Sequence, residues 1–270
     1  MGRKHWSSAK IFARLLTNKT RKTYWDNVRE LRSRATPEVF DQAAALLASQ
    51  VDREVIIGVD VLAQLGWWER FDRPTVLDLL FELLDQNPSP HLLNPVLVAI
   101  GHNNEALHPS RIQQLQTYQN HRFSDVRFGL VHALSGLEDP VAINTLLRLT
   151  TDRHPSVRDW ATFSLGTQID THSEAITQAL WARLRDPHRH TQLEAIAGLT
   201  KRKDPRIKDL LVAELQTVGS HDSLILDCIV ELNDPDFIPL LEKQLGAHRL
   251  HRGVEEQWLL DALHQLRRQG

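Results

Sequence analysis

The feature that most constrains this chain is a helical segment that recurs along most of its length. Apolar residues nearly always occupy the first, fifth and ninth positions of each copy, and a small residue usually occupies the eighth. Successive copies lie 35, 34, 31, 34 and 33 residues apart, and they begin at Ile57, Leu92, Val126, Val157, Thr191 and Leu224. A spacing of this size, with two helices in each unit, predicts a helical solenoid in which each repeat packs against its neighbours.

Proline marks the starts of the helices that alternate with these copies. Each of six prolines opens a stretch of helical periodicity: Pro37, Pro74, Pro109, Pro140, Pro205 and Pro235. Four of them follow threonine or aspartate, whose side chains accept hydrogen bonds from the free N–H groups of a helix start, while proline itself has no N–H to leave unsatisfied. We therefore expect an all-α fold, a right-handed α-solenoid of about eight antiparallel helix pairs.

The most complete copy of the repeat covers residues 139–165. It reads Asp139-Pro140, Leu146-Leu147-Arg148-Leu149, Asp152, Pro155-Ser156-Val157-Arg158, Ala161 and Leu165. This pattern resembles a HEAT repeat, and it is most similar to the short-repeat subclass named after the phycobilin lyases. The resemblance covers about residues 36–268. It implies that Asp152 and Arg158 form a structural ladder between adjacent repeats, and that the second helix of each repeat lines a concave face.

The N-terminal residues differ in charge from the repeat array. Residues 1–34 contain ten Lys or Arg and two acidic residues, so they carry a charge of +8 and the remaining residues carry −10. We expect residues 1–35 to form basic capping helices and residues 36–270 to form one continuous array, because terminal repeats are atypical. An alternative is that this segment binds nucleic acid or an anionic membrane. The basic N-terminal patch would then consist of Arg3, Lys4, Lys10, Arg14, Lys19, Arg21 and Lys22.

The sequence lacks the motifs that would indicate catalysis or a metal centre. It contains no Gly-rich phosphate loop, no Gly-x-Ser-x-Gly and no His-Glu pair, although HEAT-fold di-iron hydroxylases carry repeated His-Glu pairs. His188 and His190 beside Asp186, and His248 with His251, have the spacing nearest to that of metal ligands. We expect these histidines to be solvated loop residues, and we predict no metal and no cofactor.

The single cysteine and the hydropathy pattern indicate where the protein resides. Cys228 lies in the apolar string from residue 224 to residue 230, which predicts a buried structural thiol. One thiol and no disulfide framework fit a reducing compartment. Lys10 and Arg14 interrupt the N-terminal apolar segment, as a secretory signal would not allow, and no apolar run reaches about 18 residues. We expect a cytoplasmic protein.

Polar and aromatic residues recur at fixed positions of the second helices, where solvent exposure is expected. An acidic concave groove with an aromatic anchor suits a basic protein segment. We therefore predict a non-enzymatic protein-binding solenoid, such as a scaffold, an adaptor or an inhibitor of the immunity-protein kind. The predicted partner-binding residues are Asp60, Gln64, Trp67, Trp160, Ser164, Glu194, Asp227 and Glu231.

Two enzyme classes remain as alternatives. The repeat subclass suggests phycobilin lyase-like chemistry, but a shared fold does not establish a shared activity. Small HEAT-like proteins also include alkylpurine DNA glycosylases, which need a basic face with tryptophans. This chain has suitable tryptophans at Trp67, Trp68, Trp160 and Trp181. Its repeat array is acidic, however, which opposes the binding of phosphate.

Overall fold

The chain folds into helices joined by short loops. The computed structural model describes residues 3–217, 223–248 and 256–269, and it contains no strand among them. The chain divides into two compact units, residues 1–145 and residues 146–270, which we call unit 1 and unit 2 and describe separately. The prediction of an all-α fold built from repeated helix pairs is confirmed.

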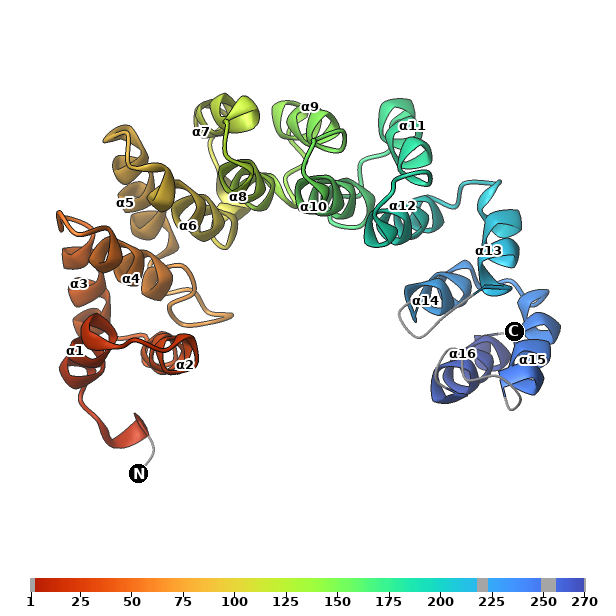
Figure 1. Ribbon diagram of the computed structural model, residues 1–270, viewed down its shortest axis with the longest axis horizontal. Helices are drawn as coiled ribbons and strands as arrows, with labels where there is room; N and C mark the ends of the chain where they lie inside the picture. Colours follow the sequence, from red (N-terminus) through yellow and green to blue (C-terminus); the bar gives the residue numbers. More distant parts are fainter. Residues whose placement is uncertain (1–2, 218–222, 249–255, 270) are drawn as a thin grey trace. The chain divides into compact units, whose positions relative to one another are not determined.

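The helices of unit 1 form two layers. The first helices of the pairs are α1 (Ser8–Thr17), α3 (Pro37–Leu46), α5 (Arg73–Asp85) and α7 (Pro109–Gln116). The second helices are α2 (Arg21–Arg32), α4 (Asp52–Leu62), α6 (Pro90–Gly101) and α8 (Ser124–Leu134). Short 3-10 helices lie at Arg3–His5, Asn104–Ala106 and Thr117–Asn120. Each second helix packs against the next one, so these four form a continuous layer within the unit (Figure 1).

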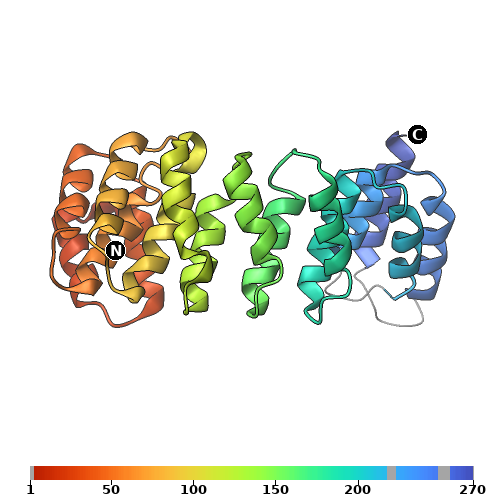
Figure 2. The ribbon, with the colours of Figure 1, turned by 90° about the horizontal axis from the view of Figure 1, so that it is seen from above.

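Unit 2 repeats this arrangement. Helix α9 (Pro140–Leu149) crosses the boundary between the units. The remaining first helices are α11 (Glu174–Arg183), α13 (Ile207–Leu215) and α15 (Phe237–His248), and the second helices are α10 (Pro155–Gly166), α12 (Arg189–Lys201), α14 (Ser223–Leu232) and α16 (Glu256–Gln269). The second helices again pack on one another in chain order. Figure 2 shows that the helices within each unit lie side by side.

The hydrophobic core of each unit lies between its two helix layers. Burial of these apolar side chains is the main force that holds the pairs together. Fully buried leucines and isoleucines come from both layers and include Leu80, Leu97, Leu130, Leu165, Ile196 and Leu211. Cys228 is also buried, at 1% exposure, so the prediction of a buried thiol is confirmed.

The predicted helix starts are confirmed at four of the six prolines. Pro37, Pro109 and Pro140 are the first residues of their helices, and Pro74 is the second residue of α5. The expected starts at Pro205 and Pro235 are wrong by two residues, because the chain makes a further turn before α13 and α15 begin.

Each of these two delayed starts follows an aspartate whose side chain binds the backbone two residues further on. The Asp204 carboxylate accepts a hydrogen bond from the backbone N–H of Arg206 at 3.0 Å, and Asp234 binds the N–H of Asp236 in the same way at 2.9 Å. Asp139 binds the N–H of Val141 in the same way at 2.7 Å, yet α9 begins at Pro140, so this bond alone does not delay a helix.

Pro95 lies inside α6 without delaying its start. The helix begins at Pro90, where proline suits the first helical position, and it runs through Pro95 to Gly101. None of the helices in the described ranges is long and apolar enough to cross a membrane. The cytoplasmic location stays a prediction.

Candidate protein-binding surface

The second-helix layer of unit 2 carries four acidic residues and one tryptophan, which we call the acidic surface: Asp159, Trp160, Glu194, Asp227 and Glu231. The first two come from α10, Glu194 comes from α12, and the last two come from α14. Trp160 is 36% exposed, Asp227 and Glu231 are exposed, and Glu194 is half-buried. Consecutive second helices are in contact, so the three helices present these side chains from one layer.

The carboxyl groups of α10 and α12 affect each other. Burial, and then the negative charge of Asp159, raise the pKa of Glu194 to about 7. Burial also raises the pKa of Asp159, although His188, His190 and a hydrogen bond from the Thr191 hydroxyl act in the opposite direction. The Nδ1 atom of His188 lies 3.9 Å from the Asp159 carboxylate. A cation placed near Glu194 would therefore favour the ionised form that burial opposes.

Helix α14 extends this negative field. Burial raises the pKa of the Cys228 thiol to about 12, and the charges of Glu231, Asp227 and Glu194 act in the same direction. The negative charges of all three carboxylates therefore reach the Cys228 thiol of α14. Glu194, Asp227 and Glu231 form no hydrogen bond or ion pair with any other residue of the described ranges. The carboxylates of Asp227 and Glu231 are therefore available to a partner, and a bound cation would also favour ionisation of Glu194.

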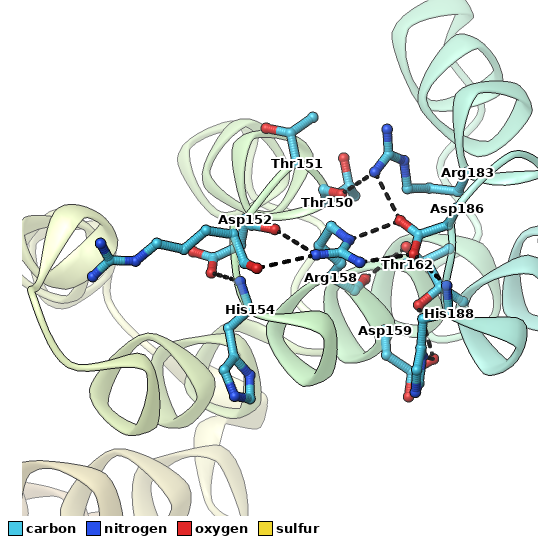
Figure 3. A network of polar contacts seen from close by, with 12 residues as sticks. Thr150, Thr151, Asp152, His154, Arg158, Asp159, Thr162, Arg183, Asp186 and His188 are labelled. Carbon is cyan, nitrogen blue, oxygen red and sulfur yellow. Dashed lines mark hydrogen bonds and ion pairs between the residues drawn. The ribbon is translucent and has the colours of Figure 1, made fainter.

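A network of charged and polar groups fixes the loops at one end of this layer (Figure 3). Arg158 of α10 donates two hydrogen bonds to the buried Asp186 carboxylate, at 2.7 and 2.8 Å. Arg158 also donates to the carbonyl oxygen of Asp152 at 2.9 Å. Arg183 binds both Asp186 and the carbonyl oxygen of Thr150, each at 3.0 Å. These bonds tie the loop before α10 to the loop before α12.

The structural ladder that the HEAT resemblance implies is therefore present in unit 2, but Arg158 binds the carboxylate of a different aspartate from the one expected. The carboxylate that Arg158 binds belongs to Asp186, whereas Asp152 contributes a backbone carbonyl to Arg158. In the next repeat Gln192 occupies the position of Arg158, and its amide donates to the carbonyl oxygen of Asp186 at 2.6 Å. The arginine and the glutamine thus have the same structural role.

The predicted histidine pairs show no metal site. Within the described ranges, no group of three His, Cys, Asp or Glu side chains is arranged to hold a metal ion. The rings of His188 and His190 are 5.6 Å apart, His188 contacts the Thr191 hydroxyl at 3.2 Å, and Asp186 is bound by two arginines. The other pair, His248 and His251, lies outside the residues whose side chains the structure describes.

Asp60, the predicted partner-binding acid of unit 1, is hydrogen-bonded to another residue of the same unit. The Tyr24 hydroxyl donates a hydrogen bond of 2.6 Å to the Asp60 carboxylate. Burial raises the pKa of Asp60, although the bond from Tyr24 and the charge of Arg32 oppose this shift. Arg32 donates to the backbone carbonyl of Asp60 and, at 2.6 Å, to the side-chain oxygen of Gln64. Asp60 and Gln64 therefore belong to a polar network that joins α2 to α4.

The surroundings of this network are basic. The Gln64 amide lies 3.1 Å from Nδ1 of His102. Dehydration of the ring, followed by the charges of Arg32, Arg70 and His132, lowers the pKa of His102 to about 4. The second-helix layer of unit 1 thus differs in charge from that of unit 2, although the sequence predicted one acidic groove.

Ser164 and Trp67 differ from the prediction of an exposed binding face. Ser164 is fully buried, and its hydroxyl donates to the Trp160 carbonyl of the same helix at 2.7 Å. Its inclusion among the predicted partner-binding residues is wrong. Ser164 occupies the eighth position of the repeat, where small residues let neighbouring helices approach closely. Trp67 lies in the turn after α4 with a φ of 54° and is partly buried, whereas Trp68 is 95% exposed.

The basic N-terminal patch is spread over the 3-10 helix Arg3–His5, α1, α2 and the loop between α1 and α2. Lys4, Lys10, Arg14, Lys19, Arg21 and Lys22 are exposed. Arg3 is held internally, since it donates to the Asn27 side chain at 2.7 Å and pairs with Asp26 at 3.4 Å. Lys10 lies 4.6 Å above the ring of Trp6.

Three residues that lie on or beside the acidic surface are not among the partner-binding residues predicted from the sequence. Asp159 precedes Trp160, and its influence on Glu194 needs the packing of α10 on α12. Trp258 and Asp261 lie on α16, outside the aligned copies of the repeat, and they line a groove with Asp227. The spacing of three residues between Trp258 and Asp261 could have indicated that both lie on one face of a helix.

Comparison with known proteins shows a related helical-repeat fold. No family model matches the sequence. Protein YibA of Escherichia coli strain K12 is 30% identical over 137 residues, which cover 51% of this chain and 48% of YibA. The same protein of Escherichia coli O157:H7 gives the same values. The match thus spans about half the length of these relatives.

Solved structures extend the similarity at the level of the fold. An X-ray structure of YibA from Escherichia coli has a TM-score of 0.70 at 22% identity, and the match covers 98% of this chain and 94% of that one. The crystal structure of an engineered protein has a TM-score of 0.55 at 14% identity, covering 96% of this chain and 77% of that one. At these identities the likeness shows the fold alone.

Proposed function

We propose that this chain is a non-enzymatic protein-binding repeat protein, and that the acidic surface of unit 2 binds a basic segment of another protein. The observation that supports this most directly is the set of unpaired carboxylates of Glu194, Asp227 and Glu231 beside the exposed ring of Trp160. Complementary charge guides association, and a partly exposed aromatic side chain can anchor it. The repeats are HEAT-like in this proposal, of the subclass named after the phycobilin lyases.

The proposal is narrower than the sequence prediction. It leaves out Asp60 and Gln64, which are engaged with Tyr24 and Arg32, and it leaves out the buried Ser164. It also assigns no catalytic residue.

Affinity capture from a lysate of the native host tests the proposal. The bait would be the tagged full chain, compared with a variant carrying Asp227→Lys and Glu231→Lys. The matched control is Glu174→Lys with Asp209→Lys, which reverses two exposed charges on the first-helix layer of the same unit. Circular dichroism would verify that both variants fold.

We expect a basic protein to be retained by the native chain and the control, and lost by the Asp227 and Glu231 variant. Retention should weaken as salt is raised, because the attraction between exposed charges is screened. A partner retained equally by all three baits would contradict a role for the acidic surface.

The basic N-terminal patch supports a second candidate function, attachment to single-stranded nucleic acid. Lys19, Arg21 and the exposed Trp25 line an open cavity of about 420 Å³ between α2 and α4. Cations that follow the phosphates and an aromatic ring for base stacking are the usual elements of such binding. Fluorescence anisotropy with a labelled oligothymidine tests it, and Lys19→Glu with Arg21→Glu should weaken binding about tenfold. Equal binding by the native and variant chains would remove this candidate.

A further inference from the structure

A groove lies between α14 and α16, at the end of the second-helix layer of unit 2. Its volume is about 330 Å³. Leu226, Val230 and Ala262 form apolar parts of its lining, and Trp258, Asp227 and Asp261 also line it. Asp227 belongs to the acidic surface, so the groove is continuous with that surface.

Among the described residues that line the groove, the charged side chains have one sign. These are Asp227 and Asp261, which are exposed, and no described lysine or arginine lines the groove with them. The Asp261 carboxylate accepts one hydrogen bond, from the side-chain amide of Gln257 at 2.8 Å, which leaves acceptor capacity on its oxygens. Glu231 lies one helical turn from Asp227 and adds to the negative field.

The combination of carboxylates, apolar wall and indole restricts what can fill the groove. An anion would be repelled by the two aspartates, and a purely apolar side chain would leave them without a counter-ion. An arginine side chain matches all three features, because its alkyl stem packs on apolar residues and its planar guanidinium binds carboxylates and stacks on aromatic rings. A lysine ammonium would satisfy the charge, but it is strongly hydrated and cannot offer the planar fork.

We propose that the groove between α14 and α16 binds an arginine side chain of the basic partner segment, with the guanidinium between Asp227 and Asp261 and against Trp258. The inference rests on the proposed function, since it names the anchor residue of the partner. Arginine in this groove would fix the register of the segment, and neighbouring basic residues would then face Glu231 and Glu194.

The indole N–H signal of Trp258 allows a direct test in the full-length chain. The seven tryptophans give separate indole signals in a ¹⁵N-labelled sample, and the variant Trp258→Phe identifies the one that belongs to Trp258. The probe is N-acetyl-L-arginine amide. The neutral isostere N-acetyl-L-citrulline amide and the lysine analogue serve as comparisons.

We expect the Trp258 signal to shift saturably with the arginine probe, to shift less with the lysine probe, and not to shift with citrulline. The variant with Asp227→Asn and Asp261→Asn should bind the arginine probe about tenfold more weakly, because it loses both charge-assisted contacts. A control with Glu174→Gln and Asp209→Asn removes two exposed charges from the first-helix layer of the same unit and should bind as the native chain does.

Two outcomes would overturn the inference: a Trp258 signal unmoved by arginine, or equal shifts with arginine and citrulline. Failure here is distinguishable from failure of the proposed function. If the capture experiment succeeds and arginine does not shift Trp258, the acidic surface binds its partner without this groove. If arginine shifts Trp258 and the Asp227 and Glu231 variant still retains its partner, the groove binds a guanidinium and the proposed function is wrong.

Discussion

Single carboxyl groups make the acidic surface sensitive to pH, and Glu194 shows the effect most clearly. Its pKa is raised to about 7 by burial and by Asp159, from an ordinary value of 4.5. A carboxyl group whose pKa is raised in the folded state favours folding while it stays protonated. That contribution is complete below pH 4.5 and is lost as the pH rises through 7. Native stability should therefore fall between these two values.

The variant Glu194→Gln should remove this pH dependence. The free energy of unfolding of the variant minus that of the native chain should be about 1–2 kcal/mol larger at pH 8 than at pH 5. This figure is reduced because solvent screens a half-exposed group. Urea unfolding of both proteins at the two pH values measures this difference. A constant difference across the range would mean that Glu194 titrates near its ordinary pKa.

At the scale of helices, the packing of α10 on α12 depends on two glycines. A Cβ atom added to Gly198 would lie 2.5 Å from the Cα of Gly166 and 3.0 Å from a methyl carbon of Leu180. Such a distance to backbone cannot be relieved by a side-chain rotation, so the helices would have to separate. The same contact sets how close Asp159 and Glu194 lie.

We therefore expect Gly198→Ala to destabilise the protein by about 1–3 kcal/mol, although alanine favours a helix more than glycine does. Gly246→Ala is the matched control, because an added Cβ at this α15 position meets nothing within 4 Å. The control should be neutral or more stable by up to about 1 kcal/mol. Thermal or urea unfolding distinguishes the two variants, and equal effects would contradict the close contact.

The loops between the helices are held by the pairing of Arg158 with Asp186. Burial alone would raise the pKa of Asp186, but hydrogen bonds from Arg158 and from the backbone of His188, with the charge of Arg183, hold it below its usual range. A carboxyl group with a lowered pKa stabilises the fold above its unfolded pKa, and this contribution is lost as the pH falls through the folded value.

Asp186→Asn should destabilise the protein by about 3 kcal/mol at pH 7, because it leaves two arginines without their shared carboxylate. The difference from the native chain should be smaller at pH 3 than at pH 7, because pH 3 lies below the ordinary aspartate pKa and the contribution of the ionised carboxylate is being lost there. Urea unfolding at the two pH values tests this, and a cost that is the same at both would show that charge is not the cause.

At the scale of the whole molecule, each unit is held together mainly by contacts between neighbouring repeats. A fragment of residues 1–136 retains the four pairs from α1 to α8 and ends in the loop after α8. We expect it to give a helical circular dichroism spectrum and a cooperative thermal transition, because repeat arrays are stabilised by nearest-neighbour interfaces.

The control for this fragment ends at residue 122, just before α8. It should be much less stable and prone to association, since it exposes the apolar face of α6 that α8 covers. Equal stability of the two fragments would contradict the view that helix pairs are the folding units of this chain.

The repeat, the helix pairs and most of the helix starts could be predicted from the amino-acid sequence. These features depend on local physics: apolar spacing selects a helix face, and residues such as Thr36 and Pro37 satisfy the start of a helix within a few residues of chain. The same local pattern predicted the buried thiol of Cys228, which the structure confirms. The structural role of Arg158 was implied by the resemblance to HEAT repeats, and the structure shows its bonds to Asp186.

Which polar side chains remain available to a partner depends on how neighbouring repeats pack. Equivalent positions in the repeat hold Asp60, bound to Tyr24, and Asp227, which has no partner in the described part of the chain. The same packing buried Ser164, exposed Trp68, and brought Trp258 and Asp261 to the groove beside Asp227. Whether a polar side chain is free to bind a partner depends on side chains of the neighbouring repeat, which lie about 30 residues away in the sequence. Helical periodicity shows which face of its own helix a residue occupies, but it does not show which side chain of the next repeat lies opposite.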